Sequence, residues 1–147
     1  MDMLIPGIQG ILVDAAATKA MYASLPQPTI ASDDLQAVNW RENRDAVIPA
    51  SFRALLDRVG VPSDWPLMAT AEHDVADTKR YDGMVFFVGQ RDAKAPALPL
   101  ELTGFEPLTV RLSDDLLMAP SAWNDTKALM IEFTAVVPWT VDIAANA

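Results

Sequence analysis

The sequence predicts an α+β, or mainly β, domain in which N-terminal helices precede an antiparallel sheet. Two observations support this prediction: apolar residues recur at helical spacing in the first half of the chain, and they alternate with polar residues in the second half. The strands follow the helices instead of alternating with them, which argues against a βαβ fold. Short strands and proline-rich turns also fit a sandwich or a barrel.

Two helices are expected, over about 8–24 and 49–59. The first is indicated by apolar residues three and four apart and by a run of alanines. The second has the clearer stripe, formed by Ile48, Phe52, Leu55, Leu56 and Val59. Pro49 suits the first turn of this helix, and Gly60 suits the residue just past its end.

Between these helices, residues 29–48 are polar and irregular and predict a long loop with one helical turn after Ser32. With 147 residues the chain has the size of one domain, so we expect a single domain over 1–147. Its helical, loop-rich part is 1–62 and its β-rich part is 67–147.

The sheet, sandwich or barrel is expected from about 67 to 143. Period-two alternation indicates strands with one buried face, and a glycine-bounded apolar run indicates another strand. Pro99 fits an edge strand best, and Pro138 is expected to break the last strand or mark a bulge. The expected strands cover residues 83–89, 98–102, 108–112, 129–133 and 139–143.

Charge and cysteine content exclude several classes of function. The chain has 20 acidic and 11 basic residues, a formal charge of −9, which repels phosphate backbones and argues against direct nucleic-acid binding. It has no cysteine, which excludes disulfides, thiolate zinc sites and cysteine nucleophiles.

The N-terminal residues do not resemble a signal peptide, because Pro6, Gly7 and Asp14 interrupt the apolar residues and no basic residue precedes them. The apolar stretch 133–141 is nine residues long, whereas a membrane span needs about 20. We therefore expect a soluble protein that is cytoplasmic when synthesised and has no membrane partner.

The single histidine, His73, lies between Glu72 and Asp74, and a histidine beside a carboxylate can serve as a general base. Neighbouring residues of a strand point to opposite faces, so His73 cannot share a face with both, and a solvated polar loop is the favoured interpretation. With Asp77 added, the group still lacks the second histidine of the familiar zinc spacings.

Other chemical motifs are missing from the sequence. There is no Gly-x-Ser-x-Gly elbow and no phosphate-binding glycine loop. The sequence therefore predicts no catalytic residue, no cofactor and no metal, and we expect the protein not to be an enzyme.

The tryptophans are the candidate interface residues, because all of them lie in loop-like or proline-flanked surroundings where a side chain either plugs the edge of the core or anchors a partner. They are Trp123, the first choice, followed by Trp40, Trp65 and Trp139. The seven methionines, Met118 and Met130 among them, are interpreted as adaptable core filler.

Three hypotheses of function remain, in this order. The first is a non-catalytic structural subunit of a large symmetric assembly, whose partners are copies of itself and other subunits; a virion component such as a capsid decoration or tail protein is its concrete form. The second is an acidic binding or inhibitor protein of the immunity or anti-defence type, which requires acids clustered on one face. The third is a small enzyme or ligand-binding domain that uses His73.

Overall fold

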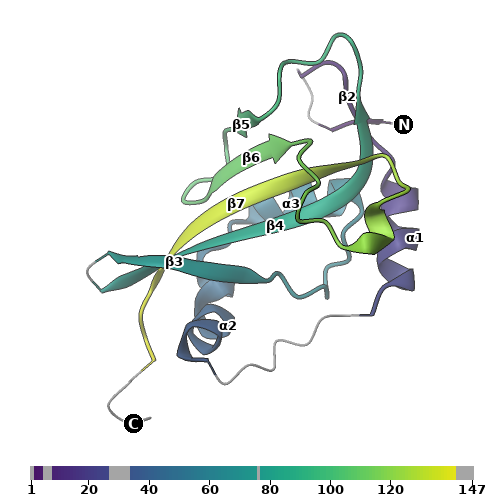
Figure 1. Cartoon of the computed structure of the whole chain (residues 1–147). Coiled ribbons are helices and arrows are strands. Elements are labelled where there is room, and N and C mark those ends of the chain that lie inside the picture. Colours follow the sequence, from purple (N-terminus) through teal and green to yellow (C-terminus); the bar gives the residue numbers. More distant parts are fainter. Residues whose placement is uncertain (1, 5–7, 27–33, 76, 142–147) are drawn as a thin grey trace.

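The computed structural model describes residues 2–4, 8–26, 34–75 and 77–141 of the chain. In these residues, helices come first and an antiparallel, curled sheet follows, as in a half-barrel (Figure 1). The helices are α1 (Ala15–Ser24), α2 (Leu35–Val47), α3 (Ala50–Val59) and the short 3-10 helix η1 (Ser121–Trp123). The strands are β1 (Asp2–Met3), β2 (Ile11–Val13), β3 (Ala69–Val75), β4 (Thr78–Arg91), β5 (Leu100–Leu102), β6 (Thr109–Ser113) and β7 (Ala128–Pro138). The predicted α+β class is confirmed.

The first predicted helix, over 8–24, is shorter than expected. It begins at Ala15, because residues 11–13 pair with the end of β4 as strand β2. The Asp14 side chain accepts a hydrogen bond of 2.9 Å from the backbone N–H of Ala17 and so caps the helix. Apolar spacing alone did not separate the strand from the helix that follows it.

The predicted loop over 29–48 is wrong for residues 35–47, which form α2; residues 29–33 lie outside the described chain. Asp34 caps α2, since its side chain accepts from the backbone N–H of Gln36 at 2.9 Å. The helix gives a weak apolar signal because Asn39 is buried beside Trp40 on its inner side. By contrast, α3 closely matches the predicted second helix.

Strand β4 is the centre of the sheet, whose order is β1-β2-β4-β7-β6-β5 (Figure 1). Along one edge, β4 pairs with β7 from Thr78↔Pro138 to Val88↔Ala128. Along the other edge, β3 pairs with its beginning and β2 with its end. The predicted strand over 83–89 is therefore only the middle of a 14-residue strand.

Helix α1 fills the gap that this leaves along β4, between Gly83, the last partner of β3, and Gly89, the first partner of β2. Thr18 Oγ1 accepts a 2.9 Å hydrogen bond from Val88 N–H, and the Tyr22 hydroxyl donates one of 2.6 Å to the carbonyl of Phe86. The N–H of Asp14 donates to the carbonyl of Val88 at 2.9 Å. Helix α1 thus takes the place of a strand along this part of β4.

The core lies between the helices and the inner side of the sheet. Phe133 of β7 contacts Trp40 of α2 and Phe52 of α3, at ring-centroid distances of 6.2 and 5.2 Å. Aromatic groups dominate this contact because they bury the largest apolar area per residue. Helices α2 and α3 thereby cover one side of the sheet, and the connection between β6 and β7 covers part of the other side, where Trp123 packs on Phe86.

A buried asparagine fixes the chain after β7. Asn39 Nδ2 donates to the Pro138 carbonyl at 3.1 Å, and Thr140 N–H donates to Asn39 Oδ1 at 2.9 Å. Strand β7 ends at Pro138, as predicted, but the predicted strand over 139–143 is wrong for 139–141, where the Thr140 amide binds a side chain instead of a neighbouring strand. Residues 142–143 lie outside the described chain.

Candidate functional site

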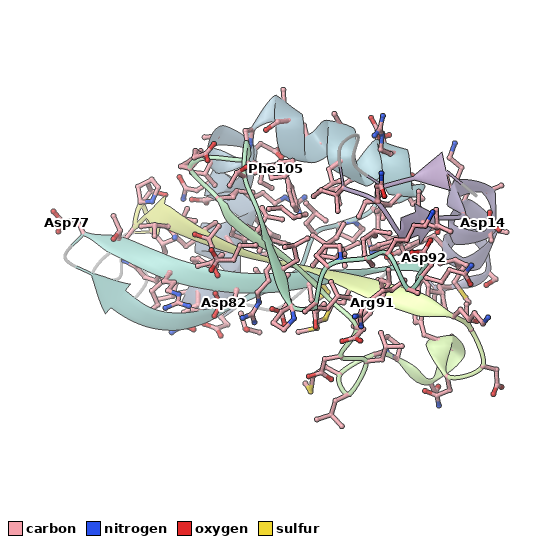
Figure 2. The ribbon with its side chains drawn as sticks, turned by 90° about the horizontal axis from the view of Figure 1, so that it is seen from above. Asp14, Asp77, Asp82, Arg91, Asp92 and Phe105 are labelled. Atoms are coloured by element: carbon pink, nitrogen blue, oxygen red, sulfur yellow. The ribbon has the colours of Figure 1, made fainter. Side chains whose placement is uncertain are left out.

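The surface of the sheet that faces away from α2 and α3 is here called the outer face. The register places alternate residues of β4, β7 and β6 on it. Figure 2 shows this face on the side opposite to α3, with Asp82 pointing toward it. Its residues are Thr70, Arg80, Asp82, Met84, Thr109, Arg111, Glu132, Thr134 and Val136.

Exposed apolar side chains gather on this side of the molecule. Met84 and Val136 are 40% and 54% exposed on the outer face. If the register of β3 and β4 is continued by one residue beyond Ala69↔Gly83, Met68, which is 50% exposed, comes opposite Met84. Single exposed apolar residues are common on proteins, but a group of them on one face marks an interaction site.

The most exposed apolar side chains lie on a loop that projects from the same side. This apolar loop, residues 114–120, carries Leu117, 86% exposed, and Met118, 72% exposed. It belongs to the connection between β6 and β7, which lies beneath the sheet in Figure 2. All the exposed large apolar residues in the described chain therefore lie on the outer face, next to it, or on this loop.

Local hydrogen bonds hold the apolar loop in shape. The N–H of Asp115 donates to Ser113 Oγ at 3.0 Å, and the N–H of Leu117 donates to Asp115 Oδ1 at 2.9 Å. The N–H of Ala119 donates to the Leu116 carbonyl at 3.0 Å. The two exposed side chains are thus displayed by a structured turn, which lowers the entropy lost when a partner binds.

Beyond Met84 the outer face is polar and holds a shallow groove of about 200 Å³. Arg111 Nε donates to Glu132 Oε2 at 2.8 Å across β6 and β7. Thr134 Oγ1 donates to Asp82 Oδ1 at 2.6 Å, and Arg80 Nε lies 3.5 Å from the same oxygen. The groove is lined by Arg80, Glu101, Thr109, Arg111, Glu132 and Thr134.

The outer face is nearly neutral, although the whole chain carries a formal charge of −9. With Glu101 of β5, which pairs with Arg111 across the strands, it has three carboxylates and two guanidinium groups. A face that mixes both signs can accept another such face without the repulsion that the rest of this acidic surface would cause.

A second hollow, of about 440 Å³, lies between α2, α3 and the chain that follows α3. Its walls carry both charge signs, and Arg53 Nη2 lies 3.2 Å from Asp45 Oδ1. Trp65 forms part of the wall, and its ring contacts Tyr22 edge-on at 4.7 Å. The described lining residues include Ser63 but no histidine beside it that could act as a base, so they do not form a nucleophilic pair.

The backbone of His73 lies on β3, while its side chain and those of Glu72 and Asp74 fall outside what the structure describes. Asp77 is exposed in the turn between β3 and β4. Among the described residues, no group of three or more His, Asp or Glu side chains is arranged to hold a metal ion. The hypothesis of an enzyme that uses His73 remains a hypothesis.

The four tryptophans predicted as interface candidates are placed differently from one another. Trp123 and Trp40 are only 2% and 1% exposed, and Trp40 Nε1 donates to the Leu67 carbonyl at 2.7 Å. Their burial fits the alternative role considered for them, as plugs of the core. Trp65 and Trp139 are partly buried, and the Lys79 ammonium lies 5.6 Å from the ring centroid of Trp139.

The interpretation of Met118 as core filler is wrong, whereas Met130 is buried as that interpretation requires. Met118 and Leu117 are the residues that the sequence analysis missed. A signal for them exists, because the run Leu116-Leu117-Met118 lies between a pair of aspartates and a proline in the connection between two strands. Of this run, Leu116 packs against the core, and its two neighbours remain exposed.

Of the helices that the structure describes, none combines the length and apolar character that crossing a bilayer requires. Comparison of the chain with models of protein families, with curated proteins and with solved structures gives no match.

Proposed function

We propose that this chain is a non-catalytic structural subunit that works through protein–protein contact in a homo-oligomeric, symmetric assembly. The observation that carries the proposal is the gathering of Met68, Met84, Leu117, Met118 and Val136 on one side of the molecule. Exposed apolar side chains that share one side of a molecule gain free energy when a partner covers them. A virion component remains the concrete form of this prediction.

The distribution of acids argues against the alternative of an acidic inhibitor. Such a protein would present its carboxylates together, opposite a basic partner. In the described chain, exposed acids occur on α2, on α3, in the hairpin turn before β4, in the connection after β4 and in the loops on either side of β6. They include Glu42, Asp45, Asp57, Asp77, Asp92, Glu106 and Asp114.

Sedimentation velocity of the full chain over a concentration series tests the proposal. We expect oligomers at micromolar concentration and a shift toward monomer in the double variant L117S/M118S, which removes apolar area from the exposed loop without touching the core. A54S, an equally polar change at an exposed position of α3, is the matched control and should leave the distribution unchanged.

Circular dichroism of each variant verifies that its fold is retained. A wild-type chain that stays monomeric throughout the concentration series would overturn the proposal. So would an oligomer that the loop substitutions leave as stable as the control does.

A further inference from the structure

We propose that the outer face is a self-complementary docking surface, onto which the outer face of a second copy of this chain fits about a two-fold axis, each copy's apolar loop lying over the Arg80 end of the other's sheet. This inference rests on the proposed function and names the surface and the partner. It follows from where the apolar loop, the arginines and the carboxylates lie along β4 and β7.

The two ends of the outer face differ. At one end the connection between β6 and β7 covers the sheet, where Trp123 packs on Phe86 with ring centroids 6.1 Å apart. At the other end the face is open and carries Arg80 opposite Val136 in the β4–β7 register. Met84 lies between these ends, since β4 places it two residues from Phe86 and four from Arg80.

A two-fold axis through the middle of the face, near Met84, interchanges its ends. The covered end of one copy then lies against the open end of the other, and the projecting loop of each fills the open space of its neighbour. Leu117 and Met118 of one copy would cover Val136 of the other, and Met84, near the axis, would meet Met84 of the other copy. Such an interface uses the same patch on both subunits and is the commonest kind in symmetric oligomers.

Charge supports the same arrangement. Asp114 and Asp115 are exposed at the base of the apolar loop. Arg80, at the open end, has a side chain that is 41% exposed, and the carboxylate that its Nε faces within the chain, Asp82 Oδ1, lies at the long distance of 3.5 Å. Docking about the two-fold axis brings the loop carboxylates of one copy toward this guanidinium of the other, and guanidinium–carboxylate pairs are strong at an interface.

A second copy of this chain also carries a formal charge of −9, so the two copies repel each other unless the contact surfaces are close to neutral. The nearly neutral outer face is a surface on which they can meet without that repulsion. Within that face, the attraction between the loop carboxylates of one copy and Arg80 of the other selects this one orientation.

Disulfide trapping tests the geometry directly, because the chain has no cysteine of its own. Single variants Leu117→Cys and Val136→Cys are mixed at about 10 µM and oxidised, and heterodimers are counted on a non-reducing gel. Two cysteines that the dimer keeps side by side have an effective concentration in the millimolar range. The disulfide should therefore form about 100-fold faster than in the control mixture of Leu117→Cys with Ala54→Cys.

A charge exchange tests the second contact. Arg80→Glu alone and Asp114→Lys alone should each weaken self-association at least about tenfold, because each sets like charges against each other. Their mixture should restore association, since both contacts of the mixed dimer are then complementary.

The outcomes separate the two proposals. An oligomeric wild type whose Leu117–Val136 trapping does not exceed the control overturns the two-fold docking and leaves the proposed function standing. A monomeric wild type overturns both. Trapping above the control together with charge rescue supports the docking, and trapping without charge rescue overturns the contact between Arg80 and the loop.

Discussion

The hydroxyl of Thr18 accepts a hydrogen bond from the backbone N–H of Val88 at 2.9 Å and donates one to the backbone carbonyl of Asp14 at the same distance. Thr18 is fully buried. One side chain therefore supports the first turn of α1 and satisfies a strand amide that no neighbouring strand reaches.

Replacement of this hydroxyl should be costly. Thr18→Val keeps the shape but leaves the Val88 amide buried without an acceptor, so we expect the free energy of unfolding to fall by about 1–3 kcal/mol. Thr18→Ser keeps the hydroxyl and should lose less. Urea unfolding followed by circular dichroism measures both, and equal losses in the two variants would contradict the role assigned to the hydrogen bond.

Because of the buried tyrosine of α1, we expect the free energy of unfolding to fall at high pH. Burial raises the pKa of Tyr22 well above its ordinary value of 10.0. The unfolded chain then releases the phenolic proton at a lower pH than the folded chain does, so the wild type loses stability as the pH rises above about 10, by up to about 1.4 kcal/mol per pH unit.

Tyr22→Phe should lose about 1 kcal/mol at neutral pH, because the Phe86 carbonyl loses its 2.6 Å hydrogen bond. The variant has no phenol, so its free energy of unfolding does not fall through ionisation at this position. The difference in the free energy of unfolding between wild type and variant should therefore narrow above about pH 10. Unfolding curves at pH 7 to 11 measure the difference. Parallel pH profiles would show that Tyr22 ionises normally in the folded chain.

Two glycines allow the cost of backbone strain to be measured apart from the cost of a steric clash. Gly60 and Gly104 both have positive φ, 92° and 96°, but a Cβ on Gly60 would lie 2.3 Å from the Ala15 carbonyl oxygen, whereas one on Gly104 meets nothing within 4 Å. Gly104→Ala should cost about 1 kcal/mol and Gly60→Ala clearly more, since α1 and the end of α3 must move apart. Thermal unfolding of both variants compares them, and similar midpoints would refute the close approach.

The buried amide of Asn39 joins α2 to the chain after β7. Asn39→Ala should lower the free energy of unfolding by about 2 kcal/mol, because the Pro138 carbonyl and the Thr140 amide lose their buried partner. Asn124→Ala, at an exposed position, is the control and should be nearly neutral. Proteolysis near the C-terminus should also become faster in Asn39→Ala only.

The part of the fold that the sequence predicted is the part with clear periodicity. The stripe of α3 and the alternation in β6 and β7 each follow one period over enough residues to identify the element. Helix α2 was missed because Asn39 occupies a buried position that the pattern assigns to an apolar residue. Strand β2 was missed because three residues are too few to show a period.

The candidate site was less predictable. Tryptophans were the reasonable choice for an interface, yet Trp40 and Trp123 are needed in the core, and the exposed apolar groups are methionines, a leucine and a valine. Alternation predicts that Arg80, Asp82 and Met84 share a face, but it cannot tell which face the helices cover. That depends on the tertiary packing of Phe52 and Trp40.

The part of β4 that pairs with α1 instead of a strand determines how the chain would aggregate. If α1 detaches, residues 84–88, of which Val85, Phe86 and Phe87 are buried, acquire a free strand edge with unpaired backbone groups. A short, uncharged, β-branched and aromatic segment of this kind recruits strands from other molecules and starts aggregation. By covering this edge, helix α1 prevents fibrillar aggregation. Substitutions that weaken its contacts with β4 should lower solubility before they unfold the protein.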